Sequence, residues 1–139
     1  MYDKIRIGIV VADIGRFFKD LEKMGVKSEK NLSDEKTFYA TSMLLFSILN
    51  RLLDLGSEII TAKQLGTPGS YRDIFKLLER NKLIKTPLSK RLINLVYARN
   101  LLAHEYQDFT NKEVYKIFNE IKAVKEFVIV IKEILKSPA

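Results

Sequence analysis

Long apolar stripes with helical spacing constrain the fold of this chain more than any other feature of its sequence. The longest stripe lies within residues 33–64, where large apolar side chains recur every three or four positions. Gly66 and Pro68 follow it and end the predicted helix. A helix with one apolar face buries that face against other elements, so the stripe predicts packing of helix on helix. The stripe consists of Phe38, Leu45, Ile48, Leu52, Leu55 and Ile59.

Further helices are predicted on both sides of this one. The first spans about residues 3–24 and ends before Gly25. Residues 28–31 are expected to form a loop. Ser70 and Asp73 resemble a capping box that opens a short helix. The apolar residues of the first helix that fall near helical spacing are Ile5, Ile9, Ala12, Phe17 and Leu21.

Two more helices complete the predicted set. Thr86 as N-cap and Pro87 at the first helical position begin one of them. Thr110 and Glu113 form a second capping box, which starts a last helix running to about Lys136. The run 127–131 has the composition of a strand, but no hairpin turn or partner strand lies nearby, so it is predicted to be helical.

The predicted fold class is therefore all-α. We expect an antiparallel bundle of four long helices plus a short helix, forming a single domain over residues 1–139. The 139 residues suffice for one sizeable core, and no repeats, low-complexity tracts or linker-like runs divide them.

Composition restricts the chemistry. The chain has no cysteine, which excludes disulfides and thiolate metal sites and fits a reducing compartment. Its single histidine cannot build a zinc site by itself, so neither a metal nor a cofactor is expected. The longest stretch without a charged residue, 37–50, is too short to cross a bilayer, and the N-terminus shows no signal-peptide pattern. We expect a soluble, cytoplasmic protein with no membrane partner.

The net charge of +7 favours polyanionic partners such as RNA, DNA, anionic lipid or an acidic protein, without choosing among them. A solubilising surface explains a charge excess of this size equally well. Basic residues crowd the stretch 80–91, which either guides a polyanion or forms an ordinary solvated face; they are Arg80, Lys82, Lys85, Lys90 and Arg91.

The strongest chemical signal is the run Arg99-Asn100-Leu101-Leu102-Ala103-His104-Glu105-Tyr106, which holds the only histidine. An arginine that binds an anion and a histidine that moves a proton suit work on a phosphodiester. On an ideal helix Arg99 and Tyr106 lie within about 20° of one another, but Arg99 and His104 lie about 140° apart. Arg99 and His104 can converge on one phosphate only if the helix ends or distorts near Ala103, or if a second chain supplies one of them.

Metal-free RNA cleavage needs a base, an acid and cations around the phosphate. One chain offers a single histidine, whereas a two-fold dimer supplies two histidines and two arginines around one groove. If this chain is a nuclease, a homodimer is therefore expected.

The pattern Arg99-x4-His104-x-Tyr106, with Asn100 directly after the arginine, resembles the signature of HEPN-domain proteins, specifically the HepT-like toxins. Similar stretches occur in such proteins at 53–56, at 70–75 and around Val114-Tyr115. The resemblance implies a helical homodimer that acts as a metal-independent endoribonuclease leaving 2′,3′-cyclic phosphate ends.

The same resemblance implies the roles of the motif residues and a partner. Arg99 and His104 are catalytic, Asn100 supports their geometry, and Tyr106 accepts AMP from a cognate MntA-type minimal nucleotidyltransferase, the antitoxin. An adenylate on Tyr106 places negative charge within reach of Arg99 and excludes RNA by bulk and repulsion. The structural alternative for Tyr106 is a ring that caps the bundle.

Other interpretations remain open at this point. The chain could be a catalytically silent binding module that holds a nucleotidyltransferase or a nucleotide, or a structural scaffold. Asp54 and Glu58 either orient Arg99 or His104, or pair with Arg51 or Lys63 as solvated carboxylates. Gly56 either permits a close helix approach, for instance at a dimer axis, or is a tolerated weak point in its helix.

Overall fold

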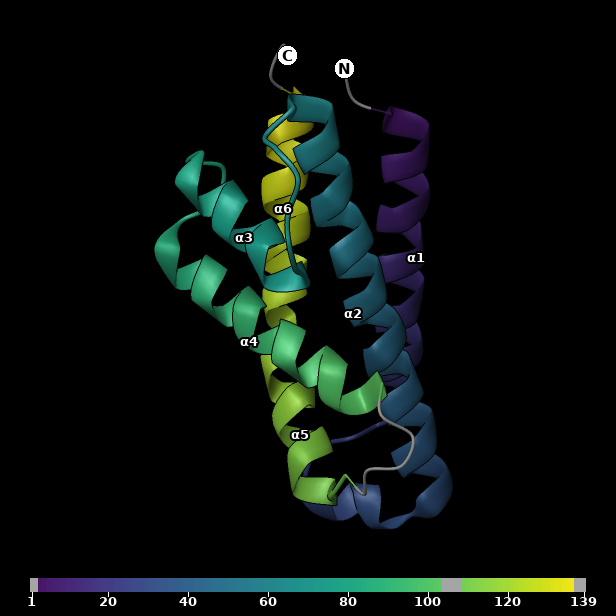
Figure 1. Cartoon of the computed structure of the whole chain (residues 1–139). Helices are drawn as coiled ribbons and strands as arrows, with labels where there is room; N and C mark the ends of the chain where they lie inside the picture. The colour runs from purple at the N-terminus through teal and green to yellow at the C-terminus, as the bar shows by residue number, and fades with distance from the viewer. Residues whose placement is uncertain (1–2, 104–108, 137–139) are drawn as a thin grey trace.

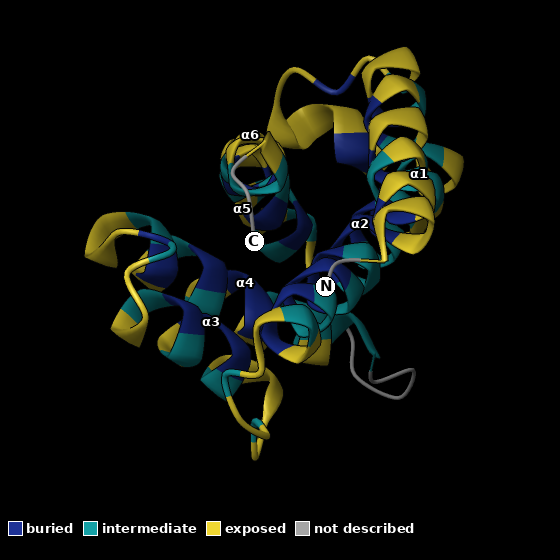
Figure 2. Cartoon of the chain, turned by 90° about the horizontal axis from the view of Figure 1, so that it is seen from above, coloured by how far each residue is buried: buried dark blue, intermediate teal, exposed yellow. Residues whose placement is uncertain are grey.

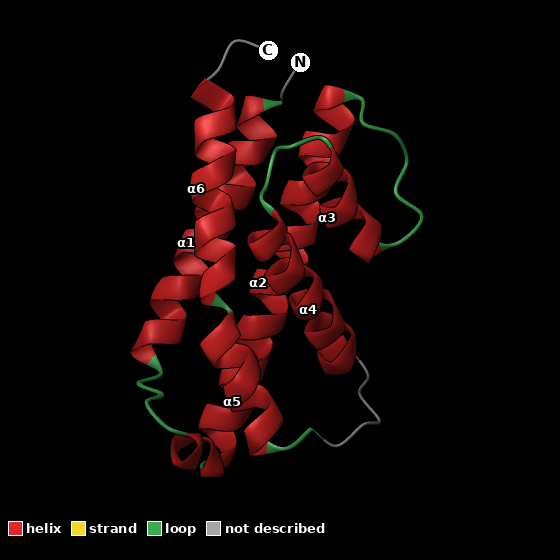
Figure 3. Ribbon diagram, turned by 90° about the vertical axis from the view of Figure 1, so that its left-hand side faces the viewer, coloured by secondary structure: helices red, strands yellow, loops and turns green. Residues whose placement is uncertain are grey.

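Every regular element in residues 3–103 and 109–136, the part of the chain that our computed structural model describes, is a helix (Figure 1, Figure 3). This confirms the predicted all-α class. The elements are α1 (Lys4–Lys23), the 3-10 helix η1 (Glu29–Ser33), α2 (Glu35–Lys63), α3 (Tyr71–Arg80), α4 (Thr86–Ala103), α5 (Asn111–Glu120) and α6 (Lys122–Lys136).

The long helix α2 is the centre of the bundle, because it packs against each of the other described helices. It runs antiparallel to α1, and α4 crosses it obliquely (Figure 1). The helices turn their buried positions toward one another and their exposed positions outward (Figure 2). All six residues of the predicted apolar stripe are buried or half-buried; of these, Leu45, Ile48, Leu55 and Ile59 have no exposed surface.

The buried face of α1 is only in part the predicted one. Leu21 is buried as predicted and Phe17 is half-buried, but Ile5 and Ile9 are 79% and 59% exposed. The other buried residues of the helix are Ile7, Val10, Ile14 and Phe18. Apolar side chains occur on two sides of this helix, so two stripes of near-helical spacing overlap in the sequence. Packing on α2 selects the stripe that includes Ile7 and Val10.

The predicted last helix is divided in two, so its prediction as one continuous helix is wrong. The division lies at Ile121, whose φ of −64° and ψ of −20° match a 3-10 turn rather than an α-helix. The Val124 N–H donates to the Ile121 carbonyl at 3.0 Å and tightens the chain there. The second part, α6, carries Phe127, whose ring contacts Phe75 of α3 edge-to-face at 5.8 Å. The helical prediction for residues 127–131 is therefore confirmed.

The predicted helix starts hold to within two residues. The Ser70 hydroxyl accepts from the Asp73 N–H, and both bonds of the Thr110–Glu113 capping box are present. The residues expected to form a loop at 28–31 instead open the 3-10 helix η1, and α2 begins at Glu35, two residues later than predicted. Thr86 is the first residue of α4 rather than its N-cap, and its hydroxyl donates to Glu79 at 2.8 Å.

Helix α3 packs closely against α2 at Gly56. This glycine is buried, and a Cβ atom placed on it would lie 2.6 Å from Cγ2 of Ile74. Real Cβ atoms do not come so close to a neighbour, so a larger residue would push α3 away from α2. The glycine thus serves a close helix approach, and that approach lies within one chain.

Within the described ranges no helix has both the length and the apolar character needed to cross a membrane. Those same residues contain no group of three or more His, Cys, Asp or Glu side chains placed to hold a metal ion.

Replacing Gly56 by alanine should lower the free energy of unfolding by about 1–3 kcal/mol, because Ile74 must shift to admit the new methyl group. Urea unfolding measures the effect. The matched control is Gly15→Ala on α1, where a Cβ meets nothing within 4 Å and should stabilise the helix by about 0.5–1 kcal/mol. Equal stabilisation by both substitutions would contradict the close contact.

Candidate active site

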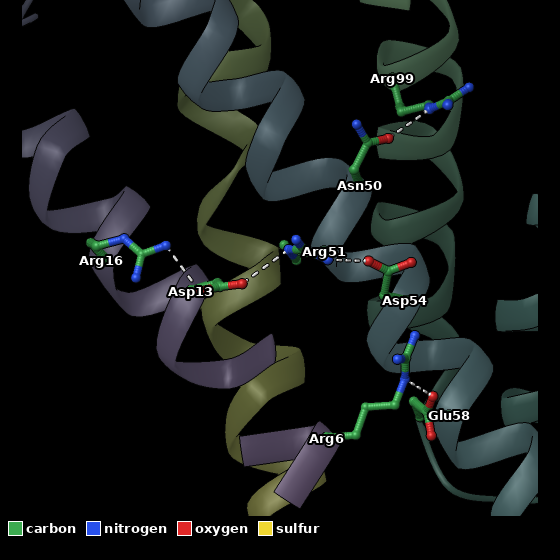
Figure 4. A network of polar contacts seen from close by, with 8 residues as sticks. All are labelled: Arg6, Asp13, Arg16, Asn50, Arg51, Asp54, Glu58 and Arg99. Atoms are coloured by element: carbon green, nitrogen blue, oxygen red, sulfur yellow. Dashed lines mark hydrogen bonds and ion pairs between the residues drawn. The ribbon is translucent and has the colours of Figure 1, made fainter. Parts of the chain in front are cut away.

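Arg99 lies near the C-terminal end of α4, on the side that faces α2. Its Nε donates a hydrogen bond to Oδ1 of Asn50 on α2, with a distance of 3.0 Å (Figure 4). One of its terminal nitrogens donates to Oδ1 of the neighbouring Asn100 at 3.3 Å. The two amide oxygens direct the guanidinium without neutralising its charge.

Two aromatic rings complete the surroundings of the guanidinium. The Arg99 Cζ lies 5.6 Å from the ring centroid of Phe46 on α2 and 5.1 Å from that of Tyr71 on α3. Both distances lie within the range of a cation–π attraction. Side chains from three helices therefore hold a half-buried Arg99 in one place.

Of the four predicted site residues, the structure describes two. Arg99 and Asn100 lie in α4 and contact each other. His104 and Tyr106 lie outside the described residues, since the described part of α4 runs to Ala103. The predicted convergence of Arg99 with His104, and the role of Tyr106, remain predictions.

A cleft of about 700 Å³ lies beside Arg99. It is formed by the start of α3, the preceding loop, the second half of α4 and one residue of α2. Tyr71 lines the cleft and contacts Arg99, and Asn100 does the same. The lining residues are Ser57, Pro68, Gly69, Ser70, Tyr71, Arg72, Ile74, Val96, Tyr97 and Asn100.

The cleft also contains a cation held in position by a phenol. A terminal nitrogen of Arg72 donates to the hydroxyl of Tyr97, at 3.4 Å, which links α3 to α4. This hydrogen bond raises the pKa of Arg72 above its usual value, and a guanidinium is in any case charged at every pH of interest. The Asp73 carboxylate accepts a hydrogen bond from the Gly69 N–H instead of pairing with Arg72.

Asp54 and Glu58 belong to a different set of contacts, between α1 and α2 (Figure 4). The Asp54 carboxylate accepts a hydrogen bond from Arg51 at 2.7 Å, which matches the predicted alternative that Asp54 pairs with Arg51. Glu58 pairs with Arg6. Glu58 therefore joins α2 to α1, whereas Asp54 pairs within α2 with Arg51, and such partly exposed pairs contribute about 0–1 kcal/mol each.

The basic stretch 80–91 lies toward the other ends of α3 and α4 from Tyr71 and Arg99. Arg80, Lys82, Lys85 and Lys90 are exposed, and Arg91 pairs with Glu126 of α6. These charges do not line the cleft.

Sequence reasoning missed several residues of this site. Asn50 was visible only as a polar side chain within the long apolar stripe of α2. Tyr71 and Arg72 lie in the segment 70–75, which resembles a stretch of HepT-like proteins, but this resemblance indicates no role for either residue. Tyr97 precedes the motif by two positions and had no signal of its own.

Comparison with known proteins gives these features a context. Residues 9–131 match the family model described as Ribonuclease HepT-like. A curated relative, the mRNA nuclease HepT of Shewanella oneidensis, is 37% identical over 81 residues. That alignment covers 58% of this chain and 61% of the relative, so the chain spans about three fifths of the curated protein it matches.

Solved structures show the same fold over nearly the whole chain. A tri-AMPylated Shewanella oneidensis HEPN toxin in complex with its MNT antitoxin is 29% identical, with a TM-score of 0.81 and coverage of 96% of this chain and 99% of the toxin. A toxin–antitoxin complex with AMP-PNP is 28% identical, with a TM-score of 0.82 and coverage of 91% and 97%. The cytosolic protein YutE of Bacillus subtilis, of unknown function, is 23% identical with a TM-score of 0.82 and coverage of 98% and 94%, which shows the fold alone.

The family match covers most of the chain, the solved HEPN toxin shares its fold, and the residues of the predicted motif that the structure describes meet beside a cleft. The protein belongs to the HepT-like ribonuclease family.

Proposed function

We propose that this protein is the toxin of a toxin–antitoxin pair and cleaves RNA as a metal-independent endoribonuclease. The observation that carries the proposal is the environment of Arg99. Among the described residues its partners are two amide oxygens and two aromatic rings, and no carboxylate forms an ion pair with it. No carboxylate of the described residues therefore competes with a phosphate for this charge at the edge of the cleft.

In the proposed reaction Arg99 binds the scissile phosphate and stabilises the charge that develops on it. A histidine removes the proton of the 2′-hydroxyl, whose oxygen attacks phosphorus while the bond to the 5′-oxygen breaks. A second histidine protonates that 5′-oxygen, which leaves a 2′,3′-cyclic phosphate and a 5′-hydroxyl. Because the chain has one histidine, His104, the second must come from another copy of the chain. The active species is therefore a homodimer.

The antitoxin in this proposal is a cognate MntA-type nucleotidyltransferase that transfers AMP to Tyr106. Two observations on similar proteins support it: one solved HEPN toxin is tri-AMPylated and bound to its antitoxin, and another complex contains AMP-PNP. Transfer breaks the bond between the α- and β-phosphates of ATP, joins AMP to the phenol oxygen and releases pyrophosphate. The toxin and its partner would meet in the cytoplasm.

Purified protein incubated with RNA in EDTA should cleave it, and His104→Ala should reduce the rate at least about 100-fold, the lower range for loss of an acid–base group. Analysis of the new 3′ ends should find 2′,3′-cyclic phosphates. The intact mass of the wild type is checked first, because an added adenylate would mask activity. Retained antitoxin binding without any cleavage by the unmodified wild type would instead select the binding module.

Asn50→Ala should lower the cleavage rate at least about tenfold, because a hydrogen bond to a charged group contributes about 1.5–3 kcal/mol and Arg99 loses its hydrogen bond to α2. Single-turnover cleavage measures this. The control is Ser47→Ala on the same helix, whose hydroxyl donates to the Met43 carbonyl of its own helix and should not affect the rate. If both variants cleave at the wild-type rate, Asn50 does not position Arg99.

Tyr106→Phe should prevent the mass increase that the cognate nucleotidyltransferase and ATP produce in the wild type, while leaving RNA cleavage active. Intact-mass spectrometry follows the modification, and a cleavage assay follows the activity. If the Phe variant still gains AMP, the acceptor lies elsewhere in the chain.

A further inference from the structure

The cleft beside Arg99 has a composition that fits a nucleotide better than an apolar ligand or a cation. Tyr71 and Tyr97 are exposed aromatic residues, 46% and 55% respectively, and both line it. Arg72 supplies a positive charge, and none of the lining residues is acidic. Its volume of about 700 Å³ lies within the about 300–1,000 Å³ range of small-ligand sites.

The neighbouring hollow provides a useful contrast. It lies between α4 and α5, measures about 390 Å³ and also includes Tyr97. Its lining contains the carboxylates of Glu113 and Glu120 against one cation, Lys116, so its net charge is negative and disfavours a phosphate. Of the two hollows that share Tyr97, only the one containing Arg72 suits an anionic ligand.

We propose that this cleft is a subsite for an unpaired nucleotide of the RNA, next to the phosphate held by Arg99. Tyr97 offers a ring on which a base can stack, and Arg72 binds the phosphate of that nucleotide. The inference rests on the proposed nuclease function and adds to it a substrate class, single-stranded RNA. Bases within a duplex are already stacked on their neighbours and cannot stack on a tyrosine ring.

The connection between cleft and Arg99 supports a continuous path for one strand. Tyr71 lines the cleft and lies 5.1 Å from the Arg99 guanidinium, and Asn100 lines it while accepting a hydrogen bond from Arg99. A strand whose phosphate reaches Arg99 therefore has its adjacent nucleotide at the cleft. The hydrogen bond between Arg72 and Tyr97 fixes the second cation relative to the ring before RNA arrives.

The test measures the binding of a labelled single-stranded RNA octamer that carries 2′-O-methyl groups and cannot be cleaved. Fluorescence anisotropy gives the Kd of the full-length protein at several salt concentrations. Tyr97→Ala should raise the Kd about tenfold, within the range expected for loss of one base–aromatic stack, whereas Tyr97→Phe keeps the ring, loses only the hydrogen bond to Arg72 and should raise the Kd less.

Arg72→Gln should also raise the Kd and should reduce the slope of log K against log salt by about 0.7, the value for one phosphate contact on a single strand. The matched control is Arg80→Gln, which removes the same charge from the other end of α3, outside the cleft. Its affinity and slope should equal those of the wild type. Arg72, Tyr97 and Arg80 are all exposed, so thermal unfolding should confirm that each variant is folded.

The outcomes separate this inference from the proposed function. If the wild type cleaves RNA but Tyr97→Ala and Arg72→Gln bind the octamer as Arg80→Gln does, the subsite is wrong and the nuclease stands. If the same variants lose affinity for the antitoxin instead of RNA, the cleft is a protein-docking surface, which also overturns the subsite. If the octamer binds through Tyr97 and Arg72 but the wild type cleaves no RNA, the subsite stands and the nuclease is wrong.

Discussion

The close approach of α3 to α2 at Gly56 is the contact on which the candidate site depends. With no side chain at this position, Ile74 can enter the space beside the α2 backbone, and the start of α3 comes to lie near α4. Tyr71 then reaches the guanidinium of Arg99. Behind α3, the edge-to-face contact of Phe75 with Phe127 connects the helix to α6. A wider separation of α2 and α3 would draw Tyr71 away from Arg99 and open the cleft.

The distribution of charge divides the molecule into two regions with different roles. Between α1 and α2, arginines are matched with carboxylates, as in the contact of Arg51 with Asp13 of α1; Arg51 also pairs with Asp54 of its own helix (Figure 4). Around Arg99 and Arg72 the described partners are amides, phenols and rings, which orient a guanidinium but leave it charged. The first arrangement stabilises a helix contact, and the second leaves cations ready for an anionic ligand.

Local sequence patterns were sufficient for most of the fold, because the long helices carry their own periodicity and several of them carry a start signal. The Thr110–Glu113 capping box is one example, because both of its predicted hydrogen bonds are present in the structure. Two features needed tertiary information. The apolar residues of α1 allow two buried faces, and only packing on α2 decides between them. The turn at Ile121 has no glycine or proline to mark it.

In the candidate site, too, some residues could be predicted from local sequence and others could not. Arg99 and Asn100 were found because they belong to a short motif in one segment. Asn50 and Tyr71 come from two other helices, and nothing near them in sequence indicates that they meet Arg99. Spacing on an ideal helix also showed that Arg99 and His104 need a change of geometry or a second chain to act together, and this remains a prediction.

Photocrosslinking would test the central claim, that RNA binds at the α3–α4 cleft beside Arg99, most directly. A single-stranded RNA containing 4-thiouridine is bound to the His104→Ala protein, irradiated, and the crosslinked peptides are sequenced by mass spectrometry. Our account predicts crosslinks to the peptides that contain Tyr71 and Tyr97. Crosslinks confined to α1, α6 or the basic stretch 80–91 would contradict it.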